Sequence, residues 1–129
     1  MRWTQMTLEG RLLLFDSVSI NNDMFTKDCE LKNPEAVPLL WGFEFDRAIG
    51  SCEVTRDEKG LLVKAVIFPE FENHVKLVLD NNGIGVGGYY NHIKIHRDDQ
   101  LTVVDKATLI AASLVLDPVR EEYYLKEVK

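Results

Sequence analysis

The residue of this chain best suited to nucleophilic chemistry is Ser113, which lies within the apolar segment Ala107–Pro118 (ATLIAASLVLDP). A serine hydroxyl is a weak nucleophile, and it reacts when a base, normally a histidine held by a third group, lies within about 3 Å. A serine in a strand can equally be a small core residue whose hydroxyl bonds a neighbouring carbonyl. The function of the chain depends on which of these roles Ser113 has.

The chain has three histidines, His74, His92 and His96, and of these His92 and His96 are the candidates for that base. His74 falls on the polar side of a predicted helix, where exposure is the default. His92 and His96 share one face of a predicted strand and stand about 13 Å apart at ~3.3 Å per residue, which is too far for both to bind one metal ion. Either could act on Ser113 if its strand lies beside the serine. We expect no metal site and no cofactor.

Six short segments between Leu8 and Pro118 form an ordered series: Leu8–Phe15 (LEGRLLLF), Pro38–Trp41 (PLLW), Ile49–Gly50, Asp57–Leu61 (DEKGL), Gly83–Val86 (GIGV) and Leu109–Pro118 (LIAASLVLDP). In this order they resemble the prohead proteases of tailed bacteriophages of the HK97 type. The resemblance implies a head-maturation serine protease fold similar to the herpesvirus assembly proteases, and a role in capsid assembly with a capsid or scaffold protein as partner.

The resemblance places the family's nucleophile at Ser113, its histidine at Phe43 and its nearby acid at Ala111. Neither phenylalanine nor alanine takes up a proton, and loss of a triad member typically removes several orders of magnitude of rate. One hypothesis is therefore a catalytically impaired relative that acts in capsid assembly. A second is an active serine endopeptidase that uses Ser113 with a relocated His92 or His96 to cleave scaffold or capsid protein. A third is a non-enzymatic interaction module unrelated to capsids.

Residues 83–88 (GIGVGG) formally match the G-x-G-x-x-G fingerprint of dinucleotide sites. That fingerprint follows a strand and opens a helix, whereas these residues follow a predicted helix and open a strand. The better interpretation is a strand edge at which Gly83, Gly85 and Gly87 let a peptide substrate approach the backbone. The pairs Tyr89-Tyr90 and Tyr123-Tyr124 are either half-buried or part of a partner surface.

The chain has 129 residues, and this length favours one domain over residues 1–129. Its net charge is −6. Its scattered basic residues argue against nucleic-acid binding, and no apolar run approaches the roughly 18 residues of a membrane span. No signal-peptide pattern is present, so the expected location is the cytoplasm of a bacterial host, associated with the procapsid. Cys29 and Cys52 lack metal-ligand spacing and are expected to be free thiols. A homo-oligomer is an open alternative.

The predicted fold class is β-rich α+β, and the resemblance implies a closed or strongly curved β-barrel with one or two flanking helices. Trp3 and Trp41 are expected to be core anchors, and a long loop is expected over Asp16–Leu31. The expected elements are strands over Trp3–Phe15, Leu39–Phe45, Ala48–Arg56, Leu61–Phe68, Ile84–His96, Leu101–Val104 and Thr108–Leu116, and helices over Pro69–Asn81 and Val119–Lys129.

Overall fold

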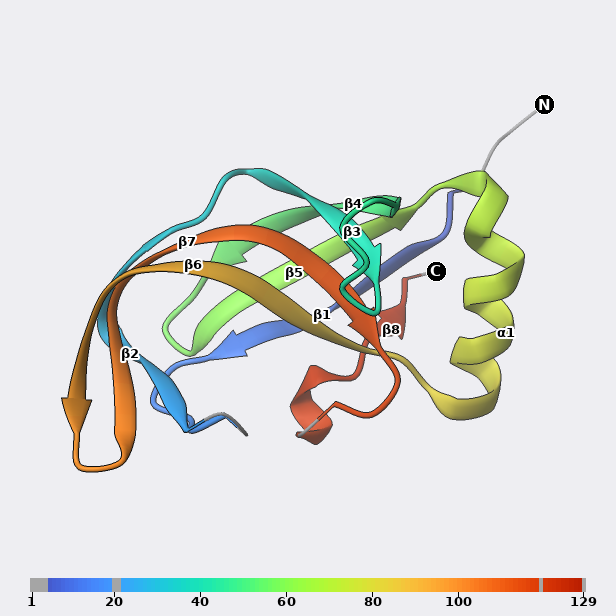
Figure 1. Ribbon diagram of the computed structural model, residues 1–129. Coiled ribbons are helices and arrows are strands. Elements are labelled where there is room, and N and C mark those ends of the chain that lie inside the picture. Colours follow the sequence, from blue (N-terminus) through green and yellow to red (C-terminus); the bar gives the residue numbers. More distant parts are fainter. Residues whose placement is uncertain (1–4, 20–21, 119, 129) are drawn as a thin grey trace.

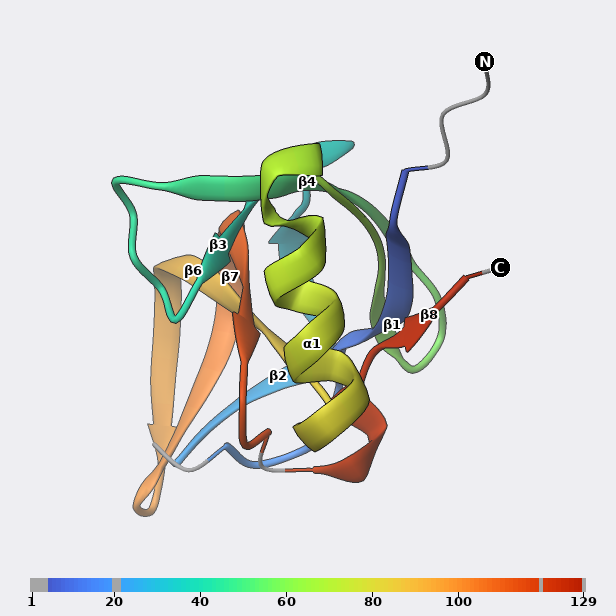
Figure 2. The same cartoon turned by 90° about the vertical axis from the view of Figure 1, so that its right-hand side faces the viewer.

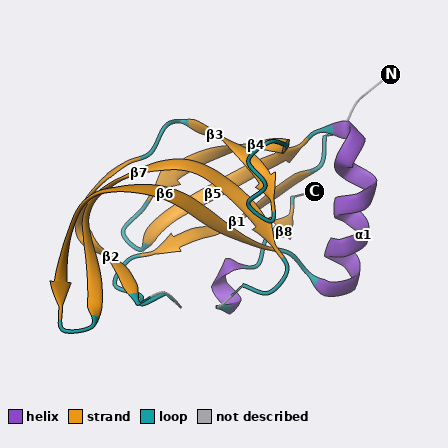
Figure 3. Ribbon diagram, viewed as in Figure 1, coloured by secondary structure: helices purple, strands orange, loops and turns teal. Residues whose placement is uncertain are grey.

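The computed structural model describes residues 5–19, 22–118 and 120–128 (Figure 1). Strands make up most of it, with one α-helix and two short 3₁₀ turns (Figure 3). No helix in these ranges is long and apolar enough to cross a membrane. In chain order the elements are β1 (Thr7–Leu14), β2 (Asp23–Lys32), β3 (Ala36–Trp41), β4 (Ala48–Arg56), β5 (Gly60–Ile67), η1 (Pro69–Phe71), α1 (Glu72–Asn82), β6 (Gly85–Asp98), β7 (Leu101–Val115), η2 (Glu121–Tyr123) and β8 (Lys126–Glu127).

The long strand β7 lies at the centre of the sheet. Along one edge it pairs in parallel with β2 and then with β3, and along its other edge it pairs antiparallel with β6. From β3 the sheet continues in the order β4, β5, β1 and β8. The segment Ala111–Leu114 of β7 is buried at every position, as expected for a strand that is covered on both faces.

The prediction of a closed or strongly curved β-barrel is wrong, because the sheet is open. Its strand order runs from β2 to β8 and does not return to its start, and β8 pairs only with Leu8 and Glu9 of β1. One isolated pair, Gly85 with Tyr124, joins the start of β6 to the segment before β8. The preceding residues Glu121–Tyr123 form a 3₁₀ turn, so the chain reaches this edge only at Tyr124 and no continuous ladder forms.

Predictions that rest on local signals are confirmed. The hairpin appears as β4 and β5, and the helix appears as η1 followed by α1. Gly83 ends the helix with φ +75°, and its N–H donates to the carbonyl oxygen of Leu79. The helix α1 buries Val75 and covers one end of the sheet in both views (Figures 1 and 2).

Two predicted elements are wrong. Residues within the expected loop Asp16–Leu31 belong to strand β2, because Phe25, Cys29 and Leu31 are buried where β2 pairs with β7. In place of the expected C-terminal helix, the described residues form η2 and the short strand β8, and Leu125 between them is buried in the core. Trp3 lies outside the described residues.

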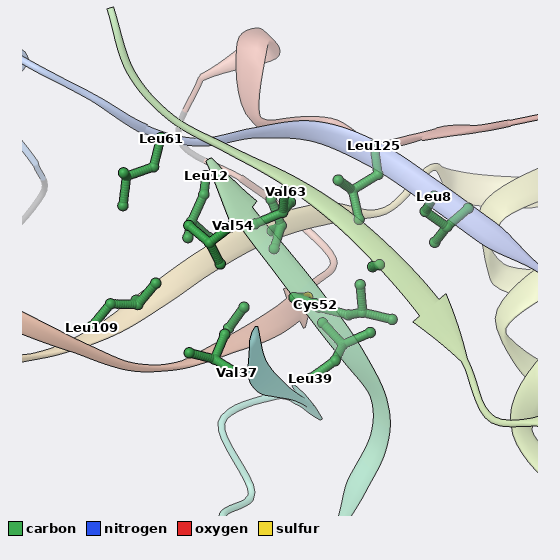
Figure 4. Close-up of a cluster of buried hydrophobic side chains, with 14 of the residues drawn as sticks. Leu8, Leu12, Val37, Leu39, Cys52, Val54, Leu61, Val63, Leu109 and Leu125 are labelled. Atoms are coloured by element: carbon green, nitrogen blue, oxygen red, sulfur yellow. The ribbon is translucent and has the colours of Figure 1, made fainter. Parts of the chain in front are cut away.

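The core lies between the curved strands, and Figure 4 shows side chains that meet there from β1, β3, β4, β5 and β7. Trp41 is half-buried and packs against this core. Both cysteines are buried free thiols. Burial raises the pKa of Cys52 to about 12, and burial is also the main cause of the raised pKa of Cys29. Neither thiol is therefore activated as a nucleophile near neutral pH.

The turn between β4 and β5 is fixed by Asp57. Its Oδ1 accepts the backbone N–H groups of Lys59 and Gly60 at 2.9 and 3.0 Å, and its two oxygens accept both terminal nitrogens of Arg11 at 2.7 and 3.0 Å. The hydrogen bond from Arg11 is the largest cause that holds the pKa of Asp57 well below its usual range. Glycine is required at position 60, since a Cβ there would lie 1.9 Å from the carbonyl oxygen of Leu13.

We predict that Asp57→Asn destabilises the protein at pH 7 and that this difference shrinks at low pH. Because the folded-state pKa lies below the unfolded value of about 3.9, the stabilisation is fully present above about pH 4 and is lost as the pH falls towards the folded-state pKa. Urea unfolding at pH 7 and pH 3 measures the difference in free energy of unfolding between the variant and the wild type. Asp46→Asn, an exposed carboxylate, is the control. Equal losses at both pH values would contradict the prediction.

Candidate functional site

Ser113 lies in β7 between two strands. It pairs with Leu40 of β3 on one side and with Gly87 of β6 on the other. Its exposed fraction is 0 %, and it is the only buried polar or charged residue within the described ranges. A buried hydroxyl is costly unless it is hydrogen-bonded, so its partners define its role.

The Ser113 hydroxyl accepts one hydrogen bond and donates another, and both partners are backbone groups. The N–H of Phe43 donates to Oγ at 2.8 Å, and Oγ donates to the carbonyl oxygen of Leu114 at 3.2 Å. The same carbonyl oxygen accepts the N–H of Gly42 at 3.1 Å. These bonds hold the loop between β3 and β4 onto β7.

Phe43, the position that the family resemblance assigns to the base, contacts Ser113 through its backbone. Gly42 and Phe43 both adopt left-handed conformations, with φ of +60° and +61°, which costs a bulky residue roughly 1–2 kcal/mol. The Phe43 ring lies beside β6, where its Cζ would be 3.3 Å from a Cβ at Gly87. The ring of Phe45 packs at 4.8 Å against that of Tyr89. The loop thus rests on both β7 and β6.

The sheet register does not bring His92 or His96 to Ser113. His92 pairs with Ala107, six residues before Ser113, and His96 pairs with Val103. Six residues of strand correspond to about 20 Å at ~3.3 Å per residue, which exceeds the reach of an imidazole. The His92 ring packs edge-on against Phe25, and His96 Nδ1 lies 2.6 Å from Asp105 Oδ2.

The remaining predicted positions have other surroundings. The His74 ring packs at 5.3 Å against Trp41, in a separate pocket of about 260 Å³ that also includes Glu44 and Arg47. Ala111 is buried opposite Tyr89 and supplies no acid. Among the described residues, no group of three or more His, Cys, Asp or Glu side chains is arranged to hold a metal ion.

The glycines of residues 83–88 leave room for side chains from elsewhere. A Cβ at Gly85 would lie 2.5 Å from Pro118, and a Cβ at Gly88 would lie 2.5 Å from the hydroxyl oxygen of Tyr90. Gly83 and Gly87 are covered in the same way by Tyr124 and Phe43. The run thus joins the end of α1 to the start of β6, and four side chains pack onto its glycines, which the spacing of the glycines alone does not reveal.

A groove of about 470 Å³, here called the edge groove, runs beside β6. Tyr89 on its wall is 46 % exposed, whereas Tyr90 packs its ring at 4.7 Å against Phe25. The Tyr90 hydroxyl is buried and has no hydrogen-bond partner among the described residues, and burial raises its pKa. The groove is lined by Leu12, Leu13, Ser17, Val18, Ser19, Asp23, Phe25, Phe43, Val86, Gly87, Gly88, Tyr89, Tyr90, His92, Val115, Asp117, Pro118, Arg120 and Tyr123.

The fold is similar to that of a known viral protease. A solved structure of the KSHV protease, in complex with a hexapeptide phosphonate inhibitor, superposes with a TM-score of 0.63 at 10% sequence identity. The match covers 98% of this chain and 66% of the protease chain, so this chain spans just under two thirds of that protein's length. No protein-family model and no curated protein matches the sequence. The comparison supports a viral-protease-like fold and does not show membership of the HK97 prohead family.

We predict that Ser113→Ala destabilises the folded protein by about 1–3 kcal/mol, because the Phe43 N–H then loses its acceptor. Urea unfolding monitored by circular dichroism measures the change. Ser51→Ala, which removes an exposed hydroxyl from β4, is the matched control and should be nearly neutral. Equal stability of the two variants would show that the Ser113 hydroxyl has no structural role.

Proposed function

We propose that this chain is a non-catalytic protein on a viral-protease-like fold, and that it acts in phage head assembly by binding a capsid or scaffold protein. The observation that carries the proposal is the state of the Ser113 hydroxyl. It is buried, it accepts the Phe43 N–H, and it donates to the Leu114 carbonyl oxygen.

Serine catalysis requires a base in contact with the hydroxyl, and this requirement supports the proposal. The nitrogen that bonds Oγ is the backbone amide of Phe43, which donates its proton and cannot accept one. The strand register separates His92 and His96 from Ser113. The alternative of an active endopeptidase with either histidine as its base therefore has no geometric support.

Two observations favour a role in capsid assembly. One is the ordered series of six segments that resembles the prohead proteases. The other is the similarity of the fold to the KSHV protease, which was crystallised with a hexapeptide inhibitor. A fold that binds peptides in one protein is a suitable platform for binding a partner segment in another, although the chemistry at the site decides the activity.

We predict that an active-site-directed fluorophosphonate probe leaves the chain unlabelled, because the Ser113 hydroxyl is buried and has no base. Intact-mass spectrometry reads the result, with an active serine hydrolase in the same reaction as a positive control. A single adduct that forms on the wild-type chain and disappears in Ser113→Ala would overturn the proposal. It would establish an activated serine.

A further inference from the structure

The edge of β6 that faces away from β7 has no strand partner beyond Gly85 among the described residues. The Leu125 N–H donates to the Ile84 carbonyl oxygen at 2.8 Å next to the single pair between Gly85 and Tyr124. Backbone groups alternate in direction along a strand. The N–H and C=O groups of Val86, Gly88 and Tyr90 therefore point toward the same open edge as those of Ile84.

The edge groove encloses this open edge from both faces of the strand. Five consecutive residues, Val86 to Tyr90, line the groove. Successive residues of a strand face opposite sides of the sheet, so a groove on one face alone would be lined by every second residue. Phe43 lines it on the face where its ring covers Gly87, and Phe25 lines it on the face where Tyr90 packs. An added strand would lie along the edge with a wall on either side.

The outer half of β6 differs from this inner half. From His92 to Asp98 the strand is exposed at every position and carries Lys94 and Arg97, and its ladder with β7 has irregularities on both sides of Lys94. Charged side chains on an exposed edge prevent it from pairing with other chains. Val86–Tyr90 has no charged side chain, and the one ladder irregularity there, between Tyr89 and Tyr90, places its extra residue on β7 rather than on β6. The part of the edge inside the groove therefore lacks the protection that charges give the outer half.

The Tyr90 hydroxyl supplies an unused hydrogen-bonding group at the same place. It lies over Gly88 and has no partner among the described residues. A buried hydroxyl without a partner is costly. Because the hydroxyl is covered and the Tyr90 ring itself lies over Gly88, an oxygen atom of a bound segment would accept this hydrogen bond once the Tyr90 side chain shifts toward the groove.

The charges around the edge groove favour a basic occupant. Asp23 and Asp117 line it, and neither has a basic partner among the described residues. The one arginine there, Arg120, forms an ion pair with Glu122 at 3.5 Å and donates to the Ser17 hydroxyl. The whole chain has a net charge of −6.

We propose that the edge groove binds an extended, apolar and basic peptide segment as an added strand on Val86–Tyr90. Its main chain pairs with Gly88 and Tyr90, its apolar side chains contact the aromatic walls, and its basic side chains face Asp117 and Asp23. The Tyr90 side chain shifts toward the groove, and its hydroxyl donates a hydrogen bond to an oxygen atom of the segment. The identification of the segment as part of a capsid or scaffold protein rests on the function proposed above, whereas the binding mode rests on the groove.

The test uses three capped heptapeptides, titrated into the ¹⁵N-labelled protein and followed by amide NMR. The first alternates valine and lysine, the second replaces each lysine by glutamate, and the third is the valine–lysine peptide N-methylated at alternate residues. We expect the first to shift the signals of Gly88 and Tyr90, and the other two to bind at least about tenfold more weakly through lost charge or backbone pairing.

Tyr90→Phe separates the role of the hydroxyl from general packing. Binding of the valine–lysine peptide should weaken by about tenfold, while the free variant is at least as stable as the wild type because the removed hydroxyl has no partner within the part of the chain that the structure describes. Tyr124→Phe, whose exposed side chain lies outside the lining of the edge groove, is the matched control and should bind like the wild type. Equal binding by all three proteins would overturn the role of Tyr90.

Other outcomes would overturn the binding mode itself. The binding mode is wrong if the peptide shifts only signals of residues away from β6, or if the glutamate peptide binds as tightly as the lysine peptide. It is also wrong if the Gly88 signal shifts with protein concentration in the absence of peptide, because a second copy of the chain would then occupy the edge. The fluorophosphonate result is independent of these measurements. An unlabelled Ser113 with no peptide binding refutes this inference alone, whereas a labelled Ser113 refutes the non-catalytic function.

Discussion

The hydrogen bond from the Phe43 N–H to the Ser113 hydroxyl determines the arrangement of the elements around it. A hydroxyl inside the fully buried part of β7 needs partners, and the Phe43 N–H reaches it in a loop whose residues 42 and 43 adopt left-handed conformations. That loop places the Phe43 ring on β6, where glycine at position 87 leaves room for it. One buried polar atom thus links the conformation of the β3–β4 loop to the surface of the neighbouring strand.

The same packing explains why part of β6 remains available for pairing. Side chains that cover glycines lie on the faces of the strand and leave its backbone edge open. The chain's own C-terminal segment comes out of η2, pairs with that edge once, through Tyr124 and Gly85, and then continues to β8. Because η2 is not a strand, the edge beyond Gly85 stays unpaired, which leaves the sheet open and leaves the groove beside Val86–Tyr90. The open sheet and the groove therefore have one structural cause.

Local sequence signals predicted the elements that depend on local interactions. The turn at residues 57–60 determines the hairpin, and the proline before α1 determines where the helix begins. Neither signal depends on the elements against which the hairpin and the helix pack. Strand β2 was not predictable in this way, because its parallel pairing with β7 joins residues that lie about seventy-five positions apart. The resemblance to the prohead proteases indicates positions 43 and 113, but only the fold shows that position 43 reaches Ser113 through a backbone amide. No residue pattern indicates that the Tyr90 hydroxyl lacks a hydrogen-bond partner among the described residues.

In the non-catalytic function that we propose, two features oppose a nucleophilic role of Ser113, and the sizes of their effects on reaction rate differ. Lifting the β3–β4 loop would break two hydrogen bonds, to Ser113 and Leu114, and the contact between Phe45 and Tyr89, at a cost of roughly 2–4 kcal/mol. Release of the left-handed backbone at Phe43 would offset roughly 1–2 kcal/mol of this cost. The loop therefore lowers the availability of the hydroxyl by at most about a few hundredfold. Loss of a catalytic base typically removes several orders of magnitude more. The absence of an imidazole at Ser113, rather than the closed loop, is the larger barrier to catalysis.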